Sequence, residues 1–86
     1  MYEIILTKTA MKMYSRLAPK LRRGVDRCLA YLAMSPAHGP NIKKLRGESD
    51  GYRYQVGGWR ILYEVDEASK TVRVYEISPR GDAYKH

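Results

Sequence analysis

The sequence of 86 residues has one cysteine, two histidines and no long apolar run. Cys28 has no second thiol, which excludes an intramolecular disulfide and a multi-cysteine metal site. Its place on the apolar side of a predicted helix favours a small core residue over a nucleophile. His38 lies in the turn-forming segment PAHGP and His86 is the last residue, so a nuclease site built on paired histidines is not favoured.

Other motifs that the sequence lacks exclude further classes of protein. The chain has no glycine-rich phosphate loop of the Walker or Rossmann type, and no group of residues favours a bound metal, so we expect neither metal nor cofactor. No apolar run approaches the length of a membrane span. The opening MYEIILTK is too quickly charged for a signal peptide. We therefore expect a cytoplasmic protein with no membrane partner.

Positive charge is abundant and unevenly distributed. The net charge is +7. Residues 1–47 carry ten basic and two acidic side chains, whereas residues 48–86 carry six basic and seven acidic ones. This distribution favours a polyanionic partner such as RNA, DNA or an acidic protein segment, because cations near phosphates release counterions and steer encounter. A basic surface that serves only solubility is the alternative.

The hydrophobic pattern predicts a single α+β domain over residues 1–86, with two N-terminal helices packed on one face of a small, mostly antiparallel β-sheet. YEIIL favours a strand that ends at Thr7, whose hydroxyl can cap the helix that follows. Apolar residues recur at helical spacing from Lys8, and Pro19 ends this helix and begins a second one. The remaining predicted strands are NIKKLRG, Tyr52–Val56, Trp59–Val65 and TVRVYEI.

The stretch YRYQVGGWR predicts a β-hairpin whose two glycines supply positive φ angles at the turn. In this register Gln55 faces Arg60, and Arg53 faces Leu62. Since side chains alternate along a strand, one face becomes apolar while Arg53, Gln55 and Arg60 share the other. Charged residues are also normal on the solvent face of a half-exposed sheet, so this pattern alone leaves a purely structural role open.

The segment after the last predicted strand contains two residues, Arg80 and Tyr84, that strengthen the case for a functional site. Arg80 follows the strand directly, and Tyr84 lies in a tail that can fold over the sheet. With Arg53 and Arg60 they would form a positive cup with one hydroxyl group. Guanidinium groups donate paired hydrogen bonds to phosphate oxygens and stabilise the charge that develops in phosphoryl transfer. A phenol is a weak base, since its ordinary pKa is about 10.

The segments IKKLRG, GYRYQVGGWRILYEVD and TVRVYEISPRGDAY resemble the RelE family of type II toxins, in the RelE and ParE superfamily, over nearly the whole chain. The resemblance implies a ribosome-dependent mRNA interferase that cleaves mRNA in the ribosomal A site, by metal-free attack of the 2'-hydroxyl on the adjacent phosphate. The implied partners are a cognate antitoxin, the ribosome and mRNA, with operator DNA reached only through the antitoxin. A ParE-like inhibitor of DNA gyrase and a non-catalytic, antitoxin-binding corepressor remain open on the same fold.

The resemblance also assigns roles within the site. It implies that Arg60 stabilises the transition state, that Arg80 stabilises the phosphate and protonates the leaving group, and that Tyr84 orients or deprotonates the nucleophile. Arg53 matches one of two basic hairpin positions after a one-residue adjustment. Gln55 falls at the other, a departure, because glutamine supplies neither charge nor a base. Either Arg53 or one of Lys43, Lys44 and Arg46 compensates for the missing charge, or the activity is altered. The expected substrate-binding residues are Lys43, Lys44, Arg46 and Gln55.

Overall fold

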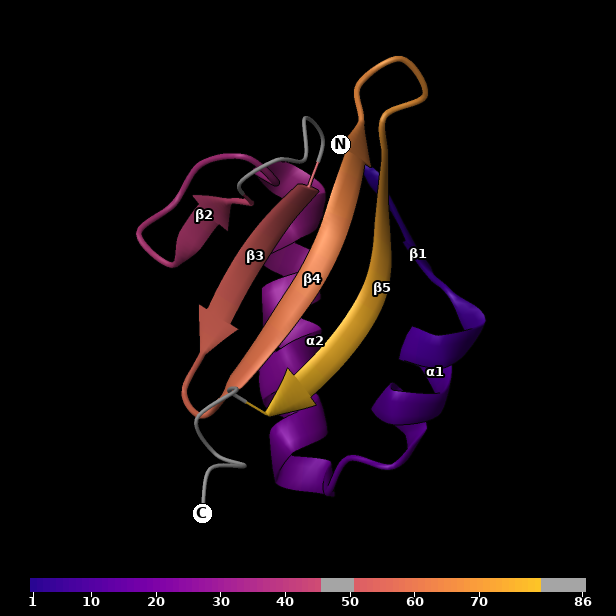
Figure 1. Cartoon of the computed structure of the whole chain (residues 1–86), viewed down its shortest axis with the longest axis vertical. Coiled ribbons are helices and arrows are strands. Elements are labelled where there is room, and N and C mark those ends of the chain that lie inside the picture. The colour runs from indigo at the N-terminus through magenta and orange to yellow at the C-terminus, as the bar shows by residue number, and fades with distance from the viewer. Residues whose placement is uncertain (46–50, 80–86) are drawn as a thin grey trace.

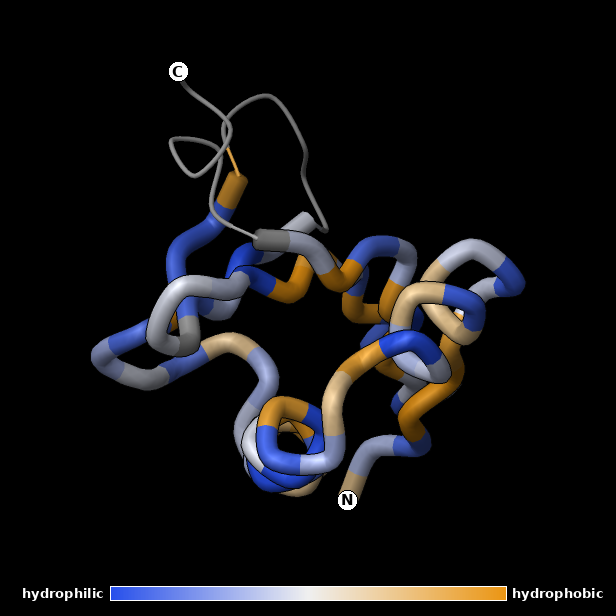
Figure 2. The backbone as a smooth tube through the Cα atoms, turned by 90° about the horizontal axis from the view of Figure 1, so that it is seen from below, coloured by the Kyte–Doolittle hydropathy of each residue, from blue (hydrophilic) through white to orange (hydrophobic). Residues whose placement is uncertain are grey.

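The computed structural model describes residues 1–45 and 51–79. Its elements, in chain order, are β1 (Glu3–Leu6), α1 (Lys8–Ser15), α2 (Pro19–Met34), β2 (Ile42–Lys44), β3 (Gly51–Val56), β4 (Trp59–Asp66) and β5 (Thr71–Pro79). The five strands form one sheet in the order β1-β5-β4-β3-β2. The β1–β5 pair is parallel and the other three pairs are antiparallel. Figure 1 shows α2 behind β3 and β4, and Figure 2 shows it nearly end-on below the strands. The predicted fold class, helices on one face of a mostly antiparallel sheet, is confirmed.

Both helices begin where the sequence predicts. Thr7 caps α1, because its Oγ1 accepts a hydrogen bond of 3.2 Å from the backbone N–H of Ala10. Pro19 is the first residue of α2, a position where the missing backbone N–H needs no partner. Cys28 is buried in the core, as expected from its place on the apolar stripe of α2. No helix in the described part of the chain is long and apolar enough to cross a membrane.

The core lies between the helices and the inner face of the sheet. Seven of its residues are fully buried: Ala10, Leu32, Ile61, Tyr63, Val72, Val74 and Ile77. The Tyr63 ring stacks on that of Tyr52 at a centroid distance of 5.7 Å and an angle of 14°. The Tyr63 hydroxyl donates a buried hydrogen bond of 2.6 Å to the carbonyl oxygen of Pro36. This contact ties β4 to the segment that follows α2.

The β3–β4 turn differs in one detail from the sequence-based expectation. Gly57 has a φ angle of 54°, whereas Gly58 lies outside the positive-φ region. The prediction that both glycines adopt positive φ was therefore wrong, since only the first one does. The predicted pairing across the turn is confirmed at every position, from Tyr52 opposite Tyr63 to Val56 opposite Trp59.

Candidate functional site

The side of the sheet away from the helices carries the polar residues of the hairpin. Gln55 pairs with Arg60, and Arg53 pairs with Leu62, so these side chains share the face opposite the core. Arg53 and Arg60 are diagonal neighbours on adjacent strands, an arrangement that places them roughly 7–8 Å apart. All three polar side chains are partly exposed. The hairpin thus positions two guanidinium groups and one amide on a single open surface.

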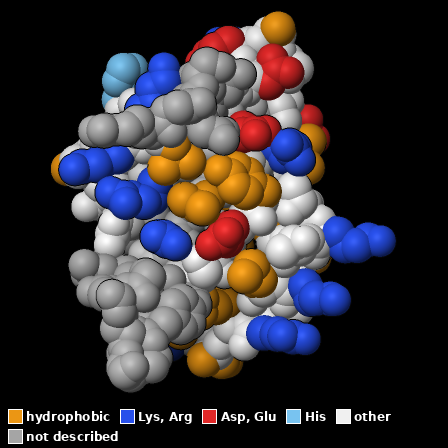
Figure 3. Space-filling model, in the orientation of Figure 1, with side chains coloured by type: hydrophobic (Ala, Val, Ile, Leu, Met, Phe, Trp, Pro, Cys, Tyr) orange, Lys and Arg blue, Asp and Glu red, His pale blue; other side chains and the backbone are white. Residues whose placement is uncertain are grey.

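Strand β2 adds one of its two lysines to this surface. Lys43 pairs with Arg53, whereas Lys44 pairs with Tyr52 of the core side. Because side chains alternate along a strand, Lys43 joins the open face and Lys44 lies on the other one. The structure therefore does not bring Lys44 to the other candidate residues. Figure 3, which views the open face, shows Lys and Arg side chains gathered over β2 and β3.

We call Lys43, Arg53 and Arg60 the cationic cluster. Among the described residues, none of the three forms an ion pair. Like charges in directly opposite positions of a sheet repel one another, so the Lys43–Arg53 pair favours a bound anion. The Nε atom of Arg60 is buried and has no hydrogen-bond partner in the described part of the chain. Three cations at this spacing suit consecutive phosphates of a nucleic-acid strand.

Strand β5 contributes two polar residues that the sequence analysis missed. Ser78 pairs with Arg60, and Glu76 pairs with Leu62, so both lie on the open face. They reach it because the β4–β5 register shifts by one residue beside Leu62 and Tyr63, a β-bulge that adds Tyr75 to β5. The Ser78 hydroxyl donates a hydrogen bond of 2.7 Å to Oε2 of Glu76.

Tyr54 and Tyr63 lie on the core side of the sheet, behind the cationic cluster. Tyr54 packs edge-on against Tyr31 of α2 at a centroid distance of 5.9 Å. Burial raises the pKa of the Tyr54 hydroxyl, and it raises the pKa of the Tyr63 hydroxyl still further. Both hydroxyls therefore stay protonated at neutral pH, and their role is packing and hydrogen bonding.

Three predicted site residues, Arg46, Arg80 and Tyr84, lie outside the described residues. Of the predicted cup, the structure therefore describes only the part on the sheet, which contains Arg53 and Arg60.

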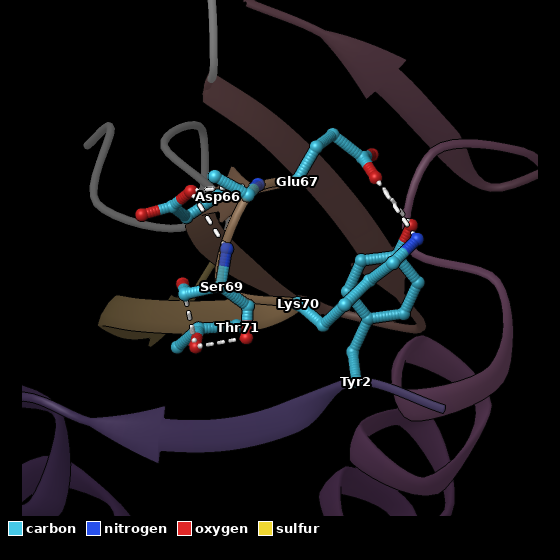
Figure 4. A network of polar contacts seen from close by, with 7 residues as sticks. Tyr2, Asp66, Glu67, Ser69, Lys70 and Thr71 are labelled. Atoms are coloured by element: carbon cyan, nitrogen blue, oxygen red, sulfur yellow. Dashed lines mark hydrogen bonds and ion pairs between the residues drawn. The ribbon is translucent and has the colours of Figure 1, made fainter.

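A hollow of about 410 Å³ lies away from the cationic cluster, beside the β4–β5 turn. Its polar groups are already engaged, as Figure 4 shows in part. Asp66 accepts hydrogen bonds from the backbone of its own turn. Glu67 accepts one of 2.7 Å from the Tyr2 hydroxyl, and Glu64 forms an ion pair of 2.7 Å with Arg73. Within residues 1–45 and 51–79, no three His, Cys, Asp or Glu side chains gather to hold a metal ion. The open face is thus the better candidate.

Two helices behind a five-stranded sheet are the architecture that this chain shares with solved RelE toxins. A family model described as the ParE toxin of the type II toxin-antitoxin system, parDE, matches residues 4–84. The chain belongs to this family, within the RelE and ParE superfamily, and is the toxin of a type II toxin-antitoxin system.

Solved structures agree with this assignment. Isolated E. coli RelE gives a TM-score of 0.83 at 26% identity, over 98% of this chain and 92% of that one. A chain of the Pyrococcus horikoshii RelE-RelB complex gives 0.82 at 25% identity, over 93% and 96%. A chain of the Mycobacterium tuberculosis RelBE2 toxin-antitoxin complex gives 0.79 at 26% identity, over 94% and 93%. No curated protein sequence matches the chain.

Proposed function

We propose that this toxin is an mRNA interferase that cleaves mRNA in the A site of the ribosome. In the proposed reaction the 2'-hydroxyl of the substrate attacks the adjacent phosphate, and no metal takes part. The observation that carries the proposal is the cationic cluster on the open face, whose cations form no ion pair among the described residues. The toxin acts as one domain spanning residues 1–86.

The geometry supports a division of labour within the cluster. Arg60 is partly exposed and forms no ion pair among the described residues, so its guanidinium is suited to donate to the phosphate at which negative charge increases during attack. Arg53 lies one strand and Lys43 two strands farther out on the sheet, and both would hold neighbouring phosphates. Gln55, opposite Arg60, can donate hydrogen bonds to the ribose-phosphate backbone without adding charge. We retain Arg46, Arg80 and Tyr84 in the proposed site, with the roles that the family resemblance implies.

The test is primer extension on mRNA in a purified translation system, with naked RNA as the control substrate. We expect cuts within A-site codons that require ribosomes. Arg60→Ala should reduce the cleavage rate by about 10²–10³, the usual effect of removing a group that stabilises transition-state charge. Arg73→Ala is the matched control, because Arg73 already pairs with Glu64. Full cleavage by Arg60→Ala would contradict the role assigned to Arg60.

The family description names ParE, so inhibition of DNA gyrase is an alternative function. A ParE-like toxin would inhibit DNA gyrase and cut no mRNA. A supercoiling assay with purified gyrase separates the two functions. Inhibition of gyrase together with intact mRNA would replace the interferase proposal.

We also propose a cognate antitoxin as partner, with operator DNA reached only through it. Chains similar to this one were solved in RelE-RelB complexes. An acidic or amphipathic antitoxin segment would complement the basic surface. Co-expression with a RelB-like antitoxin, followed by co-purification, tests this partner.

A further inference from the structure

Glu76 occupies a place on the open face from which it can reach a group bound at Arg60. Ser78 lies directly opposite Arg60, and Glu76 lies two residues before Ser78 on the same strand. Glu76 is therefore a diagonal neighbour of Arg60, at roughly 7–8 Å along the sheet, a separation that long side chains span. Leu62 lies between Glu76 and Arg53 in the same row.

The carboxylate is held in a defined orientation. The Ser78 hydroxyl donates to Oε2 of Glu76 at 2.7 Å, and Ser78 is only 6% exposed. A buried hydroxyl with this partner restricts the rotation of the carboxylate. Glu76 itself remains partly exposed and forms no ion pair with any described Lys or Arg.

The other described groups near the cationic cluster are poor proton acceptors. Gln55 has an amide, which is not basic at neutral pH. Glu64 shares the face but is paired with Arg73 at 2.7 Å. Tyr54 and Tyr63 lie on the core side, and burial raises the pKa of each hydroxyl. Among the described residues, Glu76 is thus the carboxylate next to Arg60 that is not committed to a cation.

We propose that Glu76 is the general base of the cleavage reaction, a role that rests on the proposed interferase function. Its carboxylate takes the proton of the 2'-hydroxyl while O2' forms a bond to phosphorus. The bond from phosphorus to the 5'-oxygen breaks, which leaves a 2',3'-cyclic phosphate on the upstream fragment. The 5'-oxygen takes a proton from the leaving-group acid, the role that the family resemblance gives Arg80, and both Arg80 and Glu76 return to their starting states by exchange with solvent. Tyr84 then orients the nucleophile and does not deprotonate it. Arg60 donates to the phosphate, and Ser78 is a positioning residue for Glu76.

The experiment is single-turnover cleavage on mRNA-programmed ribosomes across a pH series. Glu76→Gln keeps the shape and the acceptor for Ser78 but removes the base, so its rate should fall by about 10²–10⁴. The decline of the wild-type rate at acidic pH, which reports protonation of the base, should vanish in this variant. Glu76→Asp should restore part of the rate and the acidic decline. Glu64→Gln is the matched control on the same face and should stay within about twofold of the wild type, because its carboxylate contacts Arg73 rather than substrate.

Two further measurements test the role of Glu76. The first asks whether Glu76 acts as a base or only supports the structure, and the second asks whether Glu76 or Tyr84 is the base. Ribosomes carrying 2'-O-methyl mRNA, which cannot be cleaved, should bind Glu76→Gln and wild-type toxin with similar affinity. Tyr84→Phe should keep the acidic decline of the rate. An acidic decline lost in Tyr84→Phe but kept in Glu76→Gln would assign the base to Tyr84 and overturn the proposal. Wild-type cleavage rates in Glu76→Gln would overturn it while leaving the interferase function intact, whereas a wild type that cuts no mRNA would overturn both.

Discussion

At the scale of single residues, Tyr63 links the core to the stability of the protein at alkaline pH. Burial raises the pKa of its hydroxyl above the ordinary value. Unfolded chains lose this proton at about pH 10, whereas the folded state retains it to higher pH. The unfolded state then binds fewer protons, so the contribution of Tyr63 is complete below about pH 10 and is lost as pH rises further.

We therefore expect Tyr63→Phe to flatten the alkaline fall in the free energy of unfolding, measured by urea denaturation between about pH 8 and 11. At neutral pH the same variant should be less stable by about 1–3 kcal/mol, because the buried Pro36 carbonyl loses its donor. Tyr31→Phe is the control, since the Tyr31 hydroxyl donates to His38 at an exposed site. An unchanged alkaline slope in Tyr63→Phe would show that other groups cause the fall.

Which site residues the sequence could identify depends on local patterns. Arg53, Gln55 and Arg60 were placed on one face because a two-residue turn and period-two alternation fix their register. Lys43 and Lys44 are adjacent, and nothing in IKKL says which of them faces the site. That choice is set by the pairing of β2 with β3, two strands that residues 45–50 separate in the sequence.

At the scale of elements, the β3–β4 turn depends on one glycine of the pair. Gly57 has a positive φ, and a Cβ added there meets no atom within 4 Å, so the cost of substitution comes from the backbone alone. Gly57→Ala should lower the free energy of unfolding by about 1–2 kcal/mol. Gly58→Ala, also in open space, should be neutral or stabilising by up to about 1 kcal/mol. Equal effects in thermal denaturation would contradict this assignment of the turn.

Strand β5 shows why the position of Glu76 in the site could not be predicted from the local sequence pattern. A regular strand through TVRVYEI would place Glu76 on the same side as Val72 and Val74, facing the helices. The bulge that adds Tyr75 reverses this, so Ile77 enters the core and Glu76 turns to the open face. No turn residue or glycine in this segment signals the bulge. It follows instead from the need to bury both Val74 and Ile77 against the helices.

At the scale of the whole molecule, the two lysines of β2 test whether the open face or total charge governs RNA binding. Lys43→Gln and Lys44→Gln remove the same charge from adjacent positions on opposite faces. With a 2'-O-methyl RNA oligonucleotide, Lys43→Gln should weaken binding and reduce the slope of log K against log salt by about 1. Lys44→Gln should leave the slope nearly unchanged. Equal losses in a salt titration would indicate non-specific attraction by a basic surface.

The strand order of the sheet also determines when the fold can be completed as the chain is synthesised. Strand β1 comes first in the sequence, yet its partner in the sheet is β5, the last strand described. Arg60 likewise gains its neighbours Glu76 and Ser78 only when β5 docks on β4. Such long-range pairing closes late. A ribosome translating this toxin therefore carries an unfinished sheet until the final strand has left the exit tunnel, and the cell synthesising it has that interval in which an antitoxin can be made ready.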